Sequence, residues 1–246
     1  MGPICEFYKT TVGKKIVAAV TGALLFLFLV AHMVGNLKAF AGIDPATGMY
    51  KLDVYARFLR EFGHMVLGYS GVLWLTRIGL LVVFVIHVVT VIQLTLRNRA
   101  AGGGSYAKNR YLSSTVASRT MAIGGLILLA YVIYHILHFT TGTLHFHGFK
   151  HGHVYANAYN AFQVWWVVLI YCVAMVILGL HLYHGLWSLF QTLGLDGPRT
   201  NRPLRCLAGV LAVVIALGFM AVPLGFASGI LPAPTTQVTT QTALLR

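Results

Sequence analysis

Six histidines lie inside long apolar stretches of the sequence, where an ionisable side chain is costly and often functional. A neutral imidazole can instead bond to a neighbouring helix, and this structural role is the alternative for each of them. The first four apolar stretches each contain at least one of these histidines and the fifth contains none, which favours a shared site. The six are His32, His87, His135, His138, His181 and His184.

The apolar stretches themselves have the length of membrane-spanning helices, which need about 20 residues. Of the 246 residues, 58% are hydrophobic and 9% are charged, whereas soluble domains carry about 25% charged residues. This composition excludes an ordinary soluble domain, and it excludes a nucleic-acid binder, whose Lys and Arg are interleaved through its binding elements. We predict an all-α, polytopic membrane protein forming a single integral membrane domain over 1–246. Its spans are expected at about 16–40, 66–96, 120–141, 164–193 and 207–227, with a frayed tail at 228–246.

The basic residues indicate how the helices cross the membrane. The formal net charge is +13, from 18 Lys and Arg against 5 Asp and Glu. Lys and Arg favour cytoplasmic loops. With the N-terminus inside, the inner segments carry eleven Lys and Arg and the outer segments carry six. We therefore expect a cytoplasmic N-terminus and a C-terminus outside.

Four of the histidines fall at two depths. A helix rises about 1.5 Å per residue, which places His32 and His135 roughly 25 Å from the inner face, and His87 and His181 roughly 15 to 18 Å from it. Alternate helices of a four-helix core lie diagonally across from each other when sequence neighbours are neighbours in space. Each pair can then hold a flat apolar group between opposite walls.

Haem meets that requirement. Two neutral imidazoles give a six-coordinate iron without an open position, a centre that transfers electrons. No C-x-x-C-H motif occurs, which points to non-covalent, b-type haem. Zinc and di-iron sites compete with this interpretation, but zinc prefers Cys, carboxylate or clustered His. Carboxylate-bridged iron needs Glu on several helices, and no acid lies within the spans.

Two of the spans carry the pattern H-x-x-H, whose members share a helix face and can bind one metal. They can equally be one ligand and one hydrogen-bonding neighbour of a haem propionate or a quinone. Depth prefers His135 to His138 as the partner of His32, and it does not separate His181 from His184.

Three segments together resemble a known family. They read HMVGNL at 32–37, YHILHF at 134–139 and HLYHGLWS at 181–188. The set resembles the cytochrome b membrane-anchor subunit of succinate dehydrogenase and fumarate reductase, in its bacterial form with one chain, five helices and two haems. The resemblance covers essentially all five spans, including their order.

The resemblance implies which histidines bind haem. Spans one to four form a bundle around two haems, with one ligand from each span. These are His32 and His135 for the outer haem, and His87 and His181 for the inner haem. His181 is selected because the family's ligand sits four residues before the glycine of G-L-W-S. His184, like His138, is then a neighbour of a haem or its propionates.

The resemblance also implies the activity. The chain would anchor a flavoprotein subunit and an iron–sulfur subunit on the cytoplasmic side of a bacterial inner membrane. Electrons from succinate would reach a quinone, with menaquinone favoured, and the chain would not oxidise succinate alone. The cytochrome b subunit of a quinol:fumarate reductase, of a formate dehydrogenase or of a hydrogenase is the nearest alternative. A haem-free proton-coupled transporter is another, although the spans lack the carboxylates that such relays use.

Possible quinone residues lie at both ends of the bundle. Some relatives use a carboxylate near the outer end of span two, and here the nearest acid is Glu61, with His64 one turn on. Both can instead be ordinary interfacial residues. Ser118 and Arg119 open span three on the inner side and are candidates for a quinone or for inner propionates. For Arg119, positive-inside anchoring is the alternative.

Two further features concern the outer side. Arg77 lies roughly 15 Å outward of His87 along one helix. Because a buried Arg needs an anion, we expect a haem propionate as its partner, with snorkelling between helices as the alternative. The loop between spans three and four contains His145, His147, His151 and His153. With no acid or Cys near, we expect a solvated loop.

Overall fold

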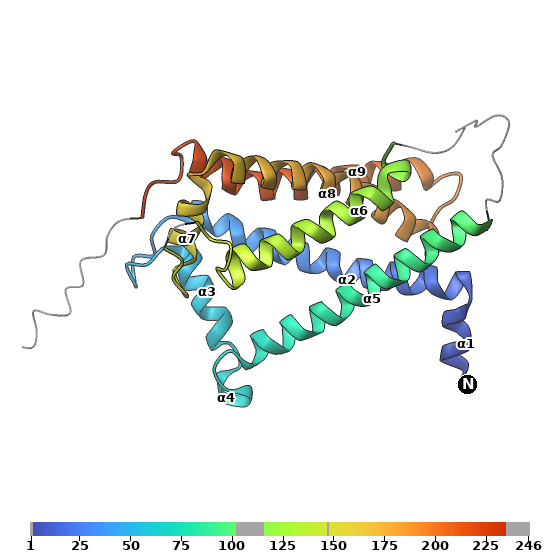
Figure 1. The fold of residues 1–246 in the computed structure, drawn as a ribbon, viewed down its shortest axis with the longest axis horizontal. Helices are drawn as coiled ribbons and strands as arrows, with labels where there is room; N and C mark the ends of the chain where they lie inside the picture. The colour runs from blue at the N-terminus through green and yellow to red at the C-terminus, as the bar shows by residue number, and fades with distance from the viewer. Residues whose placement is uncertain (1, 102–115, 147, 235–246) are drawn as a thin grey trace, which may run out of the picture.

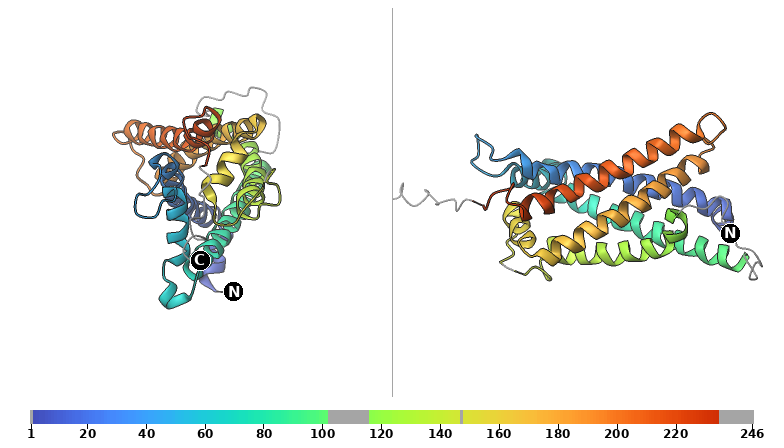
Figure 2. Two further views of the ribbon diagram at one scale, coloured as in Figure 1. Left: turned by 90° about the vertical axis from the view of Figure 1, so that its left-hand side faces the viewer. Right: turned by 90° about the horizontal axis from the view of Figure 1, so that it is seen from above.

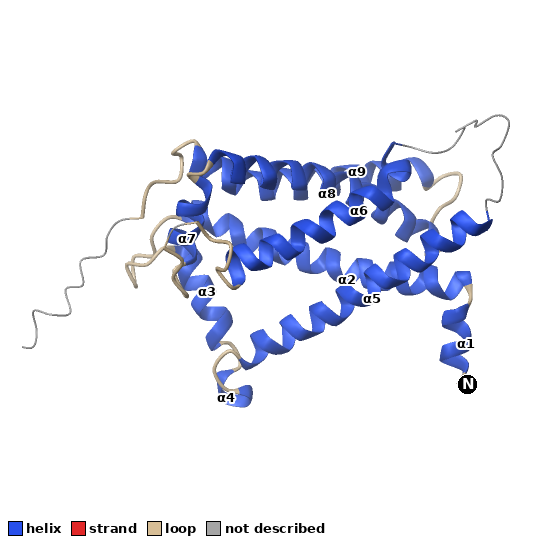
Figure 3. Cartoon of the chain, viewed as in Figure 1, coloured by secondary structure: helices blue, strands red, loops and turns tan. Residues whose placement is uncertain are grey.

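The chain folds into long helices joined by short ones. The computed structural model describes residues 2–101, 116–146 and 148–234 (Figure 1). Within these residues there is no β-strand beyond an isolated bridge between Ile43 and Tyr50 (Figure 3). Five helices are long and apolar enough to cross a membrane, which confirms the prediction of an all-α polytopic membrane protein. They are α2 (Thr11–Leu37), α5 (Gly71–Ala101), α6 (Val116–His135), α8 (Trp165–Thr192) and α9 (Asn201–Ala227).

Four of the long helices begin at least four residues away from the predicted positions, and the smallest difference among them is that of α6, which begins four residues early at Val116. α5 begins five residues later than expected, because positive φ angles at Gly68 and Ser70 place a turn there. α2 begins five residues earlier, because the Thr10 side chain accepts a hydrogen bond from the Gly13 N–H and caps the helix before the apolar run starts. α9 likewise begins six residues early, in the polar segment at Asn201.

The helices cross as a bundle whose two ends differ. We call the end that carries the N-terminus the near end and the opposite end the far end (Figure 1). α8 packs against both α6 and α9, and α2 packs against α5, α8 and α9. Figure 2 shows the bundle along its length and from above. In Figure 1, α5 lies beside α2 toward the near end and separates from it toward α4.

Small residues bring the best-packed helices together. A Cβ on Gly179 of α8 would lie only 3.3 Å from the Cβ of Ala216 in α9, the close approach that membrane helices use in place of a hydrophobic driving force. Beside this contact, Met33 of α2 is buried against Leu182 and Ile215. Many large apolar side chains point outward, as expected where lipid replaces water; Leu24, Leu81, Leu126, Val173 and Val213 are examples.

Short helices close the far end. They are α3 (Lys51–Glu61), α4 (His64–Leu67) and α7 (Val154–Phe162), with a 3-10 turn at Lys38–Ala41. Asp53 of α3 accepts a hydrogen bond from the Tyr155 N–H at 3.0 Å and so satisfies a free donor in the first turn of α7. Burial raises the pKa of Asp53, and the backbone N–H groups of Tyr155 and Val154 oppose this shift.

Tyr155 ties the same end to the C-terminal segment. Its ring stacks on Tyr50 with centroids 3.6 Å apart, and its hydroxyl donates to the carbonyl of Pro232 at 3.0 Å. Burial raises the pKa of Tyr155 to about 12. At the near end, α1 (Pro3–Lys9) is held by Arg97 of α5, which donates to the Lys9 carbonyl at 2.8 Å.

Candidate functional site

The histidines predicted to form the outer pair lie face to edge. The ring centroids of His32 in α2 and His135 at the end of α6 are 6.0 Å apart, and the rings are inclined at 79°. Two imidazoles that bind one metal ion from opposite sides have centroids roughly 6 Å apart, because a metal–nitrogen bond is about 2 Å long. Phe28 stacks on the His32 ring and Phe219 contacts it. The far pair therefore has the spacing that a shared haem iron requires.

The histidines predicted to form the inner pair come from α5 and α8. His87 and His181 lie close enough to interact electrostatically. Gly22 leaves room for the ring of His87, since a Cβ on Gly22 would lie 3.2 Å from Cε1 of His87, whereas a Cβ on Gly125 would make an ordinary contact of 3.9 Å with Cε1 of His181. The structure thus brings together both histidine pairs, each from helices distant in sequence.

The Thr21 hydroxyl lies against Nδ1 of His87. Its Oγ1 is 3.0 Å from Nδ1 of His87 and 2.7 Å from the Val17 carbonyl oxygen. A hydroxyl has one proton to donate. With that proton on the Val17 carbonyl, Thr21 accepts an Nδ1–H from His87, and the Nε2 lone pair is available to a metal. Metal-binding histidines are usually held in this way by a bond from their other nitrogen.

His181 is consistent with a bound group. Its Nδ1 is buried and has no hydrogen-bond partner among the described residues. A buried polar atom without a partner is uncommon and costs free energy. A group bound at this nitrogen would remove that cost, which the described side chains do not. His184, one turn further along α8, is half-buried and lies near His181.

A tyrosine that the sequence analysis missed organises the far pair. The hydroxyl of Tyr171 in α8 lies 3.2 Å from Nδ1 of His135 and 2.9 Å from Nδ1 of His138. Tyr171 is 5% exposed and His138 is fully buried. With one proton, the hydroxyl accepts from one imidazole and donates to the other. An Nδ1–H of His135 donated to Tyr171 leaves Nε2 as the metal-binding nitrogen, as for His87.

The backbone is distorted where these side chains meet. α6 changes to a π-helical turn over Ile136–Thr140, and the Thr141 N–H bonds to the Ile136 carbonyl at 3.0 Å. Single π turns inside membrane-length helices are rare and often lie at functional sites. Beside this turn, Tyr134 Oη and His138 Nε2 are buried without hydrogen-bond partners among the described residues.

The helix face was a signal for Thr21 but not for Tyr171. Thr21 lies eleven residues before His32, about three turns, and so shares its face of α2. Tyr171 lies ten residues before His181, so roughly 15 Å nearer the far end of α8. By depth alone Tyr171 falls beyond His135 and Thr21 falls short of His87, so the depth comparison used for the histidines finds neither of them.

The expectation that Arg77 is enclosed among the helices is wrong. Its side chain is exposed, and its guanidinium carbon lies 5.1 Å from the centroid of the Trp74 ring, one turn earlier on α5. α5 is the helix that separates from the bundle toward the far end, so this face of it is not covered by a neighbouring helix (Figure 1). The guanidinium makes a cation–π contact with the exposed Trp74 ring, and a haem propionate as its partner stays a prediction.

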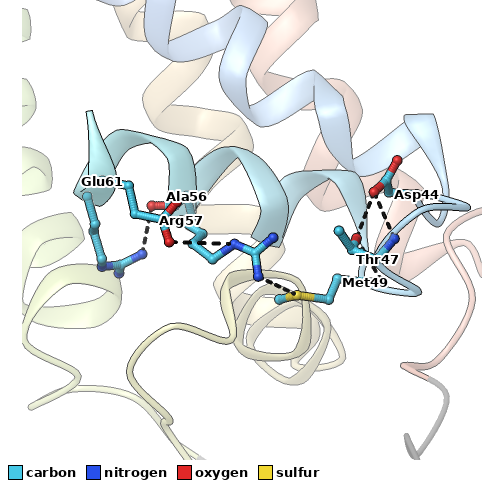
Figure 4. Close-up of polar contacts among 7 residues, drawn as sticks. Asp44, Thr47, Met49, Ala56, Arg57 and Glu61 are labelled. Carbon is cyan, nitrogen blue, oxygen red and sulfur yellow. Dashed lines mark hydrogen bonds and ion pairs between the residues drawn. The ribbon is translucent and has the colours of Figure 1, made fainter. Parts of the chain in front are cut away.

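The predicted quinone residues that the structure describes are exposed, unlike the histidine pairs. Glu61 and His64 are both exposed, and Glu61 Oε1 lies 3.9 Å from Nε of Arg57 (Figure 4). Arg57 also reaches the sulfur of Met49. Ser118 and Arg119 belong to the first turn of α6, and their side chains lie outside the described residues.

The histidines of the far loop are not all solvated, in contrast to the expectation. His145 is half-buried, with its ring centroid 5.1 Å from that of His138, because the loop folds back over the end of α6. His151 and His153 are exposed as expected, and His147 lies outside the described residues.

No group of three or more His, Cys, Asp or Glu side chains that could hold a metal ion occurs among the described residues. The two-histidine arrangement of a haem does not require one. Comparison with known proteins identifies no relative: no family model, no curated protein and no solved structure matches this chain.

Proposed function

We propose that this chain is the membrane-anchor cytochrome b subunit of a bacterial succinate:quinone oxidoreductase. In this proposal His32 with His135, and His87 with His181, are the axial ligands of two non-covalent b-type haems. Bound haem supplies a one-electron carrier at each of two depths, between an iron–sulfur subunit at the near end and a quinone. The chain lies in the inner membrane with its N-terminus in the cytoplasm.

The observation that carries the proposal is the geometry of the far pair. Its 6.0 Å centroid separation suits one iron held between two imidazoles, and the two rings come from helices that are not consecutive in the chain, α2 and α6. The hydroxyls of Thr21 and Tyr171 support it, because each one holds the Nδ1 of a candidate ligand and leaves Nε2 toward the metal.

Aromatic side chains of this chain surround His32 and His135, where the outer haem is proposed to bind. Phe28, Phe219 and Phe139 present apolar rings beside the far pair, and apolar walls exclude water from a redox centre. Glu61 and His64 at the far end remain candidates for proton transfer to a quinone, because both are exposed there.

The test is the haem content of the purified full-length chain. A pyridine haemochrome assay is expected to give two haem b per chain. A protein that is colourless after expression with adequate haem supply would contradict the proposal and would favour the haem-free transporter.

Co-purification decides which enzyme the anchor serves. A flavoprotein and an iron–sulfur subunit that retain succinate dehydrogenase activity would support a succinate:quinone oxidoreductase. The same subunits with faster fumarate reduction would indicate a quinol:fumarate reductase, and a molybdenum or nickel–iron enzyme would indicate a formate dehydrogenase or hydrogenase anchor.

A further inference from the structure

Two arginines of the far end lie close together beside the start of α5. Arg77 is in the second turn of α5, and Arg60, near the end of α3, is close enough to it to interact electrostatically. The Ser70 N–H donates to the Arg60 carbonyl at 2.7 Å, which holds the end of α3 against the turn before α5. The fold therefore brings together two guanidinium groups from different helices.

The surface around Arg77 is open and apolar. Arg77 is exposed, and its neighbours on the same side of α5, Trp74, Ile78 and Leu81, are each more than half exposed. Val85 continues this exposed apolar stripe by one more turn. α5 separates from the bundle in this region (Figure 1). A ligand can therefore reach Arg77 from outside the bundle, and no internal cavity is required.

Most hydrogen-bond donors of the two guanidinium groups are unused. A guanidinium carries five N–H donors in a planar fork. Nη1 of Arg60 donates to the Ala56 carbonyl of its own helix at 2.9 Å. Arg77 contacts the Trp74 ring and has no hydrogen bond to the described residues. The oxygens of a phosphate group match such donors in pairs.

The carboxylates nearby do not balance the two charges. Glu61 pairs with Arg57. Asp53 interacts electrostatically with Arg60, but it is buried and accepts its hydrogen bond from the backbone of α7. Like charges repel more strongly where water is scarce. An anion between Arg60 and Arg77 would replace this repulsion by two attractive contacts.

The depth of Arg77 corresponds to the boundary between the hydrocarbon and the headgroups of a bilayer. α5 has 31 residues, so it is about 46 Å long, whereas the hydrocarbon core is about 30 Å thick. About 8 Å of helix then extends beyond the core at each end. Arg77 lies about 9 Å after the first residue of α5. Tyr69 and Trp74, both exposed, lie just outside it, where aromatic residues of membrane proteins gather.

We propose that Arg60 and Arg77 bind the phosphate of one anionic phospholipid in the leaflet at the far end. An acyl chain of this lipid lies along the exposed stripe of Ile78, Leu81 and Val85. A haem propionate is the competing anion, and the exposure of this face of α5 favours the lipid. The site goes beyond the function proposed above and does not depend on it.

The experiment counts the phosphatidylglycerol that the full-length protein retains, by native mass spectrometry, after purification with equal amounts of phosphatidylglycerol and phosphatidylcholine. Arg77→Gln and Arg60→Gln are each expected to lose one retained phosphatidylglycerol, and the double variant no more than either single one, because both side chains hold the same phosphate. Arg57→Gln is the matched control, since it removes an equal charge from the same end and is expected to retain the wild-type number.

Three outcomes would overturn the site. The first is wild-type retention by Arg77→Gln, and the second is an equal loss in Arg77→Gln and Arg57→Gln, which would show only a general effect of surface charge. The third is unchanged retention by Arg77→Gln together with a shifted midpoint potential of one haem, which would assign Arg77 to a propionate. Wild-type protein without haem contradicts the proposed function alone. If Arg77→Gln does not fold, the comparison of Arg60→Gln with Arg57→Gln decides.

Discussion

The four candidate ligand histidines differ in how firmly their neighbours hold them. Nδ1 of His87 and Nδ1 of His135 each meet a hydroxyl from a neighbouring helix, whereas His181 Nδ1 has no partner among the described residues. A ring fixed by a second hydrogen bond is pre-oriented for its metal. Each proposed pair therefore contains one histidine whose ring is held by a hydroxyl from another helix before any ligand binds.

Substitution of the two histidines of α8 distinguishes ligand from neighbour. His181→Ala is expected to reduce the haem content from two per chain to one, since His181 is the residue that lies near His87. The matched variant His184→Ala is expected to keep two. The pyridine haemochrome assay measures both, and loss of haem from His184→Ala with retention in His181→Ala would reverse the assignment.

Removal of the Thr21 hydroxyl tests the bond to His87. Thr21→Val is expected to weaken haem binding at the near site by about tenfold or more. It should also raise the midpoint potential of one haem, because the hydrogen bond increases the basicity of the imidazole. Thr21→Ser should restore both properties. Thr95 bonds only to the Val91 carbonyl of its own helix, so Thr95→Val serves as the control, and equal potentials in the two valine variants would exclude the role of Thr21.

At the scale of elements, the long helices were predictable and the short ones were not. A run of about 20 apolar residues has few folds available in a membrane other than a spanning helix, and all five such runs became helices. α3 and α7 are short and are stabilised by contacts between distant segments, such as the Asp53–Tyr155 hydrogen bond. No local pattern contains that information.

In the candidate site, too, the features visible in the local sequence were predictable and those that depend on tertiary packing were not. Its histidines stand out in the sequence because an ionisable group in an apolar run is rare, and depth along the helices predicted two pairs, of which His32 and His135 lie in ring contact. The environment of Arg77 was misjudged because the separation of α5 from the bundle depends on tertiary packing. The π turn beside His138 was not foreseen for the same reason.

The hydrogen bond between Asp53 of α3 and the Tyr155 N–H of α7 can be tested by substitution. Asp53→Ala removes the acceptor for the Tyr155 N–H and is expected to lower the free energy of unfolding by about 1 kcal/mol, the usual cost of a lost helix cap. Asp53→Asn retains an acceptor oxygen and should remain folded. Thermal unfolding in detergent measures both.

The burial of Asp53 also makes the stability of the folded protein depend on pH. Burial raises its pKa in the folded state, so protonation favours folding. The resulting contribution to stability is fully present below the ordinary pKa of Asp and is lost as the pH rises through the raised value. Wild-type stability should therefore decline relative to Asp53→Asn across that interval, and parallel pH profiles would show that burial of this carboxyl has no effect.

At the scale of the whole molecule, the uneven charge distribution predicts which end of the bundle faces the cytoplasm. Among the described residues, nine Lys and Arg lie in the segments of the near end, and basic segments of short loops stay in the cytoplasm. The proposed inner pair, His87 and His181, lies toward the same end. A cytoplasmic iron–sulfur subunit would then dock close to the first electron carrier, whereas the far pair would be close to the opposite face.

Cysteine labelling tests this orientation without altering the chain. Cys5 in α1 and Cys206 in the first turns of α9 are both exposed, and both lie at the near end, since α9 runs parallel to α2 (Figure 1). A membrane-impermeant maleimide is expected to label both cysteines in inverted membrane vesicles and neither in right-side-out vesicles. Cys172, half-buried within α8, should react in neither and provides the internal control. Labelling of Cys5 and Cys206 from the outside would place the near end in the wrong compartment for a cytoplasmic iron–sulfur partner, and the proposed electron path would then fail even if both haems were present.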